Sequence, residues 1–305
     1  MFPFLPHKLY TGYNGANTSF LSPRLWNRVT GSIMAADGNK RLFVKGDDFN
    51  QFTGATTAYY GTAGPYTGYI DTGCTITQSV GFDCGVAKLL QDGTDNDEVW
   101  LSPGSVTSQL GALSATAATQ YLTAFECRFK TSSIVDDVVS LFMGLAPEGY
   151  AVSNTKKDDV GIMANAATLA NASFIGFETI HYNGATSTAA WNGATALVPA
   201  VGQNAKMYFR YRLSGQNAIT VAKVQTLVAD TWYKVGFILD PAAVPAKRIT
   251  IYVDNVEQST YVTKTMMDAA TFPTDIYMNP LFGCHAGAGT TSSTYIDWWA
   301  CAQVL

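Results

Sequence analysis

The stretch Thr231–Gln258, TWYKVGFILDPAAVPAKRITIYVDNVEQ, contains two strand patterns that are separated by a loop with two prolines. The first pattern, 231–239, is rich in aromatic and β-branched residues, which favour strands. In the second, 248–254, apolar and polar residues alternate, which gives a strand one apolar face. The prolines stiffen the loop, and Asp254 with Asn255 suits a tight turn that needs positive φ angles. We therefore expect two neighbouring antiparallel strands that share one core-facing side.

The same alternation recurs along the chain. In AFECRFK (124–130) and KMYFRYRL (206–213), the apolar residues face one way and the charged or tyrosine residues face the other. This pattern is typical of antiparallel sheets with one face on a core and one in water. Further strand patterns cover 138–146, 174–180, 276–283, 293–304 and part of 40–52, and 72–85 suggests a hairpin. Amphipathic helix patterns are nearly absent, so the fold class that the sequence predicts is all-β, with two antiparallel sheets packed as a sandwich.

Three pieces occur in an order that resembles the laminin-G-like, concanavalin A-like jelly roll. These are the W-Y-x-V strand, the I-x-I-Y-V-D-N strand and turn, and the final TYIDWWACAQVL. The resemblance covers about 120–305 and implies a sandwich domain over 113–305. Residues 1–112 then form an N-terminal arm and β-rich extension, which either adds strands to the sandwich edge or lies on it as an arm. This fold hosts lectins, hydrolases, adhesion modules and virion proteins, so it does not define a function.

Charged residues make up only 14% of the chain, and the net charge is −4. A weakly charged surface suits a protein whose surface meets neighbouring subunits, or an extracellular β protein. The chain has no basic stripe for nucleic acid and no apolar run of about 18 residues for a membrane span. The first residues lack a basic leader and a cleavage site, so we expect no secretion signal and free thiols in a reducing cytoplasm. The alternative is a disulfide between Cys74 and Cys84 across a hairpin.

The acidic stretch DGTDNDE supplies the candidate metal ligands Asp92, Asp95, Asp97 and Glu98. Clustered carboxylates suit Ca²⁺, which prefers oxygen ligands, although such stretches are often solvated surface loops. Glycoside hydrolysis would require two facing carboxylates about 5–10 Å apart. Neither DNDEVW (95–100), which has the character of a loop, nor FETIHYN (177–183) has the alternating acids that would supply them. We therefore expect no enzymatic activity and no obligatory cofactor.

The composition, together with the jelly-roll resemblance, is similar to that of structural proteins of tailed bacteriophages. It implies a virion protein, either a capsid decoration (cement) protein or a head fibre. We expect it to be assembled in the host cytoplasm as a homo-oligomer whose partner is the major capsid protein or another virion protein. Phe2, Phe4 and Leu5 are the candidate anchor, because exposed apolar side chains are costly and the neighbouring prolines favour an extended segment. The alternative is that this segment folds back on its own sandwich.

A second function is a glycan-binding module of a tail fibre or other surface adhesin. The tyrosine-rich stretch TAYYGTAGPYTGY (57–69) and the adjacent Trp298 and Trp299 supply aromatic rings that can stack on sugars. Adjacent residues of a strand point to opposite faces, so we expect one tryptophan in the core and the other on an outer layer, a partner or a sugar. Asp297 lies among apolar residues and requires an arginine, a turn amide or a metal as its partner if it is buried.

Overall fold

The computed structural model describes residues 22–34, 42–49, 61–63, 66–79, 85–94, 97–103, 110–113, 121–147, 173–179, 202, 205–216, 218–287 and 289–304. The predicted anchor residues Phe2, Phe4 and Leu5 lie outside these ranges, as do Asp95 and Cys84. Cys74, Cys127, Cys284 and Cys301 are free thiols and are buried.

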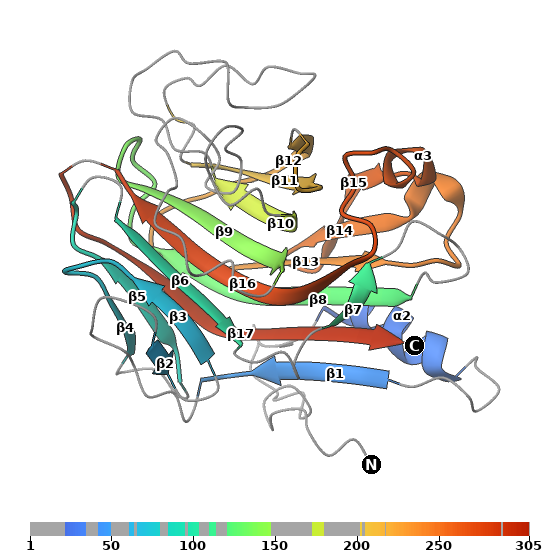
Figure 1. The fold of residues 1–305 in the computed structure, drawn as a ribbon, viewed down its shortest axis with the longest axis horizontal. Helices are drawn as coiled ribbons and strands as arrows, with labels where there is room; N and C mark the ends of the chain where they lie inside the picture. The colour runs from blue at the N-terminus through green and yellow to red at the C-terminus, as the bar shows by residue number, and fades with distance from the viewer. Residues whose placement is uncertain are drawn as a thin grey trace.

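Two antiparallel sheets form the fold (Figure 1), and the predicted all-β sandwich is confirmed. The eight-stranded sheet has the order β15-β14-β13-β8-β17-β5-β4, with β1 also paired to β17. Its strands are β1 (Leu42–Asp47), β4 (Thr75–Gln78), β5 (Ala87–Gln91), β8 (Leu122–Thr131), β13 (Tyr233–Leu239), β14 (Ile249–Val253), β15 (Val256–Val262) and β17 (Ser292–Val304).

The nine-stranded sheet has the order β12-β11-β10-β9-β16-β6-β3-β2, with β7 paired to β16. Its strands are β2 (Gly61–Ala63), β3 (Tyr66–Ile70), β6 (Glu98–Pro103), β7 (Leu110–Leu113), β9 (Val139–Ala146), β10 (Phe174–Thr179), β11 (Lys206–Arg212), β12 (Ile219–Thr226) and β16 (Ile276–Ala286).

The stretch that predicts the fold forms β13 and β14, which pair antiparallel from Val235 opposite Val253 to Leu239 opposite Ile249. Asp254 and Asn255 have φ angles of 47° and 69°, so the expected left-handed turn joins β14 to β15. The loop between β13 and β14 contains the short 3-10 helix η4 (Pro245–Lys247). The two strands are therefore neighbours, as the alternation predicts.

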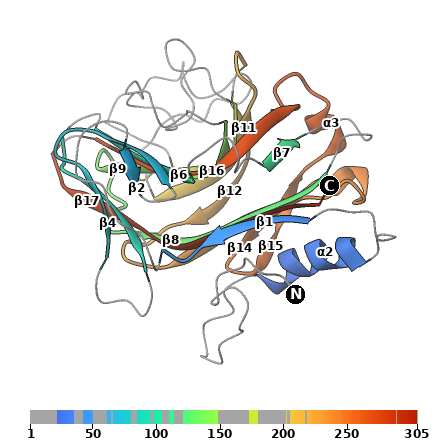
Figure 2. The ribbon, with the colours of Figure 1, turned by 60° about the horizontal axis from the view of Figure 1, so that its bottom comes forward.

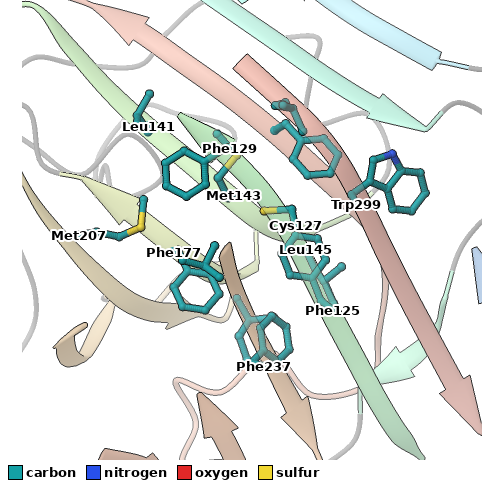
Figure 3. Packing of buried hydrophobic residues seen from close by; sticks show 14 of the residues in the cluster. Phe125, Cys127, Phe129, Leu141, Met143, Leu145, Phe177, Met207, Phe237 and Trp299 are labelled. Atoms are coloured by element: carbon teal, nitrogen blue, oxygen red, sulfur yellow. The ribbon is translucent and has the colours of Figure 1, made fainter. Parts of the chain in front are cut away.

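The main core lies between the two sheets (Figure 3). Phe237 of β13 contacts the rings of Phe125, Phe177 and Phe209, with centroids 5.8, 6.4 and 5.4 Å away. These rings come from both sheets, so they hold the sheets together, and each fully buried Phe contributes about 1.5–3 kcal/mol. Trp299 belongs to this core.

The described strands of the first hundred residues belong to the sandwich itself. β1 pairs with β17, and β6 pairs with β16. The sequence suggested a hairpin within 72–85. In the structure, β4 pairs instead with β5, which begins beyond this stretch at Ala87. Of the two arrangements expected for this region, its described strands take the one in which strands are added to the sheets. The domain boundary at residue 112 stays a prediction.

The helix α2 (Pro23–Met34) was not predicted, and it packs on the outer face of the eight-stranded sheet (Figure 2). Leu25, Trp26 and Val29 pack against buried side chains of the sheet, which include three alanines and Trp298. The two adjacent tryptophans therefore do face opposite ways, with Trp298 under an outer layer. A second helix, α3 (Lys264–Met267), is a single turn. No helix in the described part of the chain is long and apolar enough to span a membrane.

Three charged residues that alternation placed in water are buried. Arg210 and Arg212 are 0% and 1% exposed on the outer face of the nine-stranded sheet, and Glu126 is 0% exposed beneath α2. The stretch 95–100 is not entirely a loop either, because Glu98 begins β6. Strands covered on both faces lose the alternation that reveals them, and β6 is buried over most of its length.

Candidate functional site

Three groups of side chains are candidates for function: an acidic cluster, the outer face of the nine-stranded sheet and the outer face of the eight-stranded sheet. The acidic cluster consists of Cys74, Asp92 and Asp97, whose ligand atoms all lie within 4.8 Å of one another. Asp92 follows β5, Asp97 precedes β6 and Cys74 precedes β4, so strand ends gather them. Gly73, with φ of 88°, permits the close approach, because a Cβ there would lie 2.1 Å from Asp92 Oδ2.

Glu98, the fourth predicted metal ligand, does not join the cluster. Its Oε2 accepts a hydrogen bond from Trp100 Nε1 at 2.7 Å on the outer face of the nine-stranded sheet. Burial, with help from Asp92 and Asp71, raises the pKa of Asp97 to about 7, and burial raises the pKa of the Cys74 thiol to about 12. A protonated thiol is a poor neighbour for a hard oxygen-seeking cation such as Ca²⁺. The described donors thus fit calcium poorly, and the calcium site stays a prediction.

The raised pKa of Asp97 makes the stability of the folded protein depend on pH, and the direction of the pKa shift gives the direction of this dependence. Its folded-state pKa of about 7 lies above the ordinary 3.8, so its stabilising contribution is complete below pH 3.8 and is lost as the pH rises through about 7. We expect the denaturation midpoint in urea to fall between pH 5 and pH 8, and Asp97→Asn to flatten this change. Asp268→Asn, at an exposed helix end, is the control and should leave the change intact. Equal pH profiles for Asp97→Asn and the unmodified protein would contradict the assignment.

The outer face of the nine-stranded sheet carries a row that the sequence did not predict. His285 of β16 lies opposite Glu98 of β6 on one side and opposite Ser140 of β9 on the other. Directly opposed residues have Cβ atoms about 4.5–5.5 Å apart. Ser140 Oγ has no hydrogen-bond partner among the described residues. A serine, a histidine and a carboxylate thus stand side by side, in the order of a nucleophile, a base and an orienting acid.

Burial argues against catalysis by this row. Ser140, His285 and Glu98 are 0%, 1% and 0% exposed, so a substrate has no route to the hydroxyl. The Glu98 carboxylate also accepts the hydrogen bond from Trp100. The Trp100 ring covers Gly283 so closely that a Cβ at position 283 would lie 2.1 Å from it. The row is therefore part of the packing of this face.

Among the residues that the structure describes, Glu98 and Glu178 do not form the acid pair that glycoside hydrolysis requires. Glu98 lies on β6 and Glu178 on β10, three strand positions apart. This corresponds to about 14 Å, beyond the separation of about 5–10 Å that the reaction uses. Glu178 is moreover paired with Arg210, and both side chains are fully buried. These two acids cannot flank one glycosidic bond.

On the outer face of the eight-stranded sheet, α2 covers the half near the end of β17, and partly exposed side chains occupy the other half. Lys88 of β5 and Lys130 of β8 both lie opposite Tyr295 of β17, and Trp232, just before β13, follows beside Lys130. We call these four residues the cation–aromatic row. Each is intermediate in exposure.

Next to this row, Arg128 contacts the Trp232 ring and forms an ion pair with Asp297. Arg128 Cζ lies 4.8 Å from the Trp232 ring centroid, and Arg128 Nη1 lies 2.6 Å from Asp297 Oδ2. Asp297, the extra residue at an irregularity in β17, thus has an arginine as its partner, one of the three possibilities that the sequence left open. A row of two aromatic rings and two ammonium groups that reaches solvent can bind a ligand, unlike the buried polar row on the other sheet.

Comparisons with known proteins show the fold alone. No protein-family model and no curated protein matches the chain. The structure is similar to that of a protein of unknown function from Shewanella oneidensis MR-1, with a TM-score of 0.50 and 14% identity over 94% of this chain and 96% of that one. Peanut lectin with a nine-residue peptide matches with a TM-score of 0.47 and 13% identity over 87% of this chain and 99% of that one. The GH16 protein of a Bacteroides ovatus mixed linkage glucan PUL, in complex with a product, also matches with 0.47 and 13%, over 86% and 99%.

The chain is thus a two-sheet antiparallel sandwich. The particular function has to be argued from the side chains of this chain.

Proposed function

We propose that the chain is a carbohydrate-binding protein that holds a glycan, without cleaving it, on the open half of the outer face of the eight-stranded sheet. The observation that carries the proposal is the cation–aromatic row, in which Tyr295 and Trp232 reach solvent two strand positions apart. Two strand spacings are about 10 Å, so the two rings can contact separate sugars of one extended chain.

The chemistry of these side chains suits a sugar. Tyrosine and tryptophan offer an apolar ring together with a polar O–H or N–H group, and a sugar likewise combines C–H patches with hydroxyls. The flanking ammonium groups add hydrogen-bond donors that are anchored in the sheet. The absence of a usable acid pair at Glu98 and Glu178 supports binding without cleavage.

Titration of a broad panel of soluble polysaccharides tests the proposal. We expect at least one to bind saturably with no release of reducing ends or esters. Trp232→Ala and Tyr295→Ala should each weaken binding at least about fivefold, as truncation of an aromatic anchor does. Tyr277→Ala is the matched control, since Tyr277 is a 60% exposed tyrosine on β16 of the other sheet, and it should have no effect. Failure of every glycan to bind, or turnover that Ser140→Ala abolishes, would contradict the proposal.

From composition and the sequence resemblance, we also propose that the protein is part of a phage virion, as a decoration or cement protein on the capsid. The side chains that would anchor it, Phe2, Phe4 and Leu5, lie outside the described residues. Glycan binding and attachment to a particle are compatible, because the cation–aromatic row involves none of the proposed anchor residues.

A further inference from the structure

We infer that Arg128 and Asp297 are positioning residues of the proposed glycan site. Asp297 fixes the Arg128 guanidinium, and the guanidinium holds the Trp232 ring where it contacts a sugar. The inference rests on the proposed function and adds to it the two side chains that order one of its rings. Neither Arg128 nor Asp297 has to touch the ligand in this role.

A β-bulge in β17 brings Asp297 to Arg128. Tyr295 lies opposite Lys130 of β8, and Trp298 lies opposite Arg128, so three steps along β17 correspond to two steps along β8. Asp297 is the extra residue of this irregularity. Bulges redirect side chains and are over-represented next to active sites. Here the bulge puts an acid beside an arginine on the same outer face as the cation–aromatic row.

The ion pair between Asp297 and Arg128 is short and partly shielded from water. Asp297 Oδ2 lies 2.6 Å from Arg128 Nη1, and the Asp297 side chain is only 9% exposed. A hydrogen bond between a guanidinium and a carboxylate is among the strong, directional contacts of proteins. Salt screens a partly buried pair less than an exposed one. The pair therefore fixes the head of a long, flexible arginine side chain at one place on the sheet.

The fixed guanidinium lies against the Trp232 ring. Arg128 Cζ is 4.8 Å from the ring centroid, within the distance of about 6 Å at which a cation and an aromatic ring attract each other. Trp232 precedes β13, which begins at Tyr233, so the strand pairing of β13 does not itself order this residue. Lys130 Nζ, 5.4 Å from the same ring, adds a second cation contact. A ring that is ordered before the ligand arrives loses less conformational entropy on binding.

A double-mutant cycle on the full chain tests this role, with the tightest binder among laminarin, dextran, xylan and alginate as the probe. Arg128→Met should weaken binding about fivefold, but it should have no further effect in a Trp232→Ala background, because a positioning residue acts only through the ring. Asp297→Asn, which keeps the shape of the side chain, should also weaken binding. Asp240→Asn is the matched control, because Asp240 pairs with Arg28 at 2.7 Å with similar exposure, and it should bind as the unmodified protein does.

A second measurement requires no ligand. In protein labelled with fluorotryptophan, the fluorine resonance of Trp232 is assigned by its loss in Trp232→Phe. This resonance should shift towards that of a solvent-exposed, mobile tryptophan in Arg128→Met and in Asp297→Asn. It should stay in place in Asp240→Asn.

The outcomes separate the inference from the proposed function. Equal losses of affinity on Arg128→Met with and without the Trp232 ring overturn the inference and leave carbohydrate binding intact, because Arg128 then acts on the ligand or through the fold. An unchanged Trp232 resonance in Arg128→Met and Asp297→Asn also overturns it. If no polysaccharide binds, the proposed function is wrong, and the fluorine resonance alone decides whether the ion pair orders Trp232.

Discussion

Replacement of Arg210 by Met is expected to lower the free energy of unfolding by about 3–5 kcal/mol. Arg210 of β11 and Glu178 of β10 form an ion pair in which both side chains are 0% exposed. The guanidinium compensates a carboxylate that burial would otherwise make very costly, and Met fills similar space without charge. Equilibrium unfolding in urea at neutral pH measures the loss. Lys264→Met is the control, since Lys264 pairs with Asp268 on the exposed surface of α3, and it should change the free energy by no more than about 0.5 kcal/mol.

The double variant Arg210→Met, Glu178→Leu shows whether the cost comes from the stranded carboxylate. Apolar replacement of both partners of a buried pair is often neutral or even stabilising. We therefore expect the double variant to recover most of the stability that the single variant loses. A single variant that loses less than about 1 kcal/mol would mean that water reaches Glu178 and that the pair is not buried in solution.

The sequence predicted on which face of its strand each side chain lies, but it did not predict which other segments cover the outer faces of the sheets. Alternation placed Phe125 and Phe129 in the core and Glu126 on the opposite side of β8, and the structure agrees with both assignments. It also placed Glu126, Arg210 and Arg212 in water, and this was wrong. A period of two is a local property of one strand, whereas the helix over Glu126 comes from a segment about a hundred residues away. No local pattern carries that information.

Sequence analysis did not find the candidate binding residues, because they are also far apart in the sequence. Lys88, Lys130, Trp232 and Tyr295 come from four distant segments, and they become neighbours only through the pairing of β5, β17, β8 and β13. Each looks like an ordinary surface residue in its own stretch. The prediction that Trp298 and Trp299 face opposite ways succeeded because it required only the local rule. The metal prediction relied on closeness in sequence, but the strand that begins at Glu98 turns its side chain away from Asp92 and Asp97.

Replacement of Glu126 by Leu is expected to release α2 from the sheet. The Glu126 carboxylate accepts hydrogen bonds from Ser22 N at 2.9 Å and from Trp26 Nε1 at 2.8 Å, at the point where the helix begins. Leucine leaves both donors unsatisfied in a buried place, at about 1–3 kcal/mol each. It also removes a charge that compensates Lys234, whose pKa burial lowers and the Glu126 carboxylate raises. The free-energy cost of the unsatisfied donors exceeds the stabilisation that burial of the leucine side chain contributes.

Hydrogen exchange measured segment by segment tests this expectation. The amides of α2 should lose protection and Trp26 fluorescence should shift to longer wavelength, while β8 and β13 stay protected by the core between the sheets. Glu257→Leu on the edge strand β15, where the carboxylate is partly exposed, is the control and should leave α2 protected. If α2 stays protected in Glu126→Leu, its apolar contacts with Ala124, Ala300 and Ala302 suffice to hold it. Glycan binding should persist in the Glu126 variant, because α2 contacts the end of β17 opposite to Tyr295.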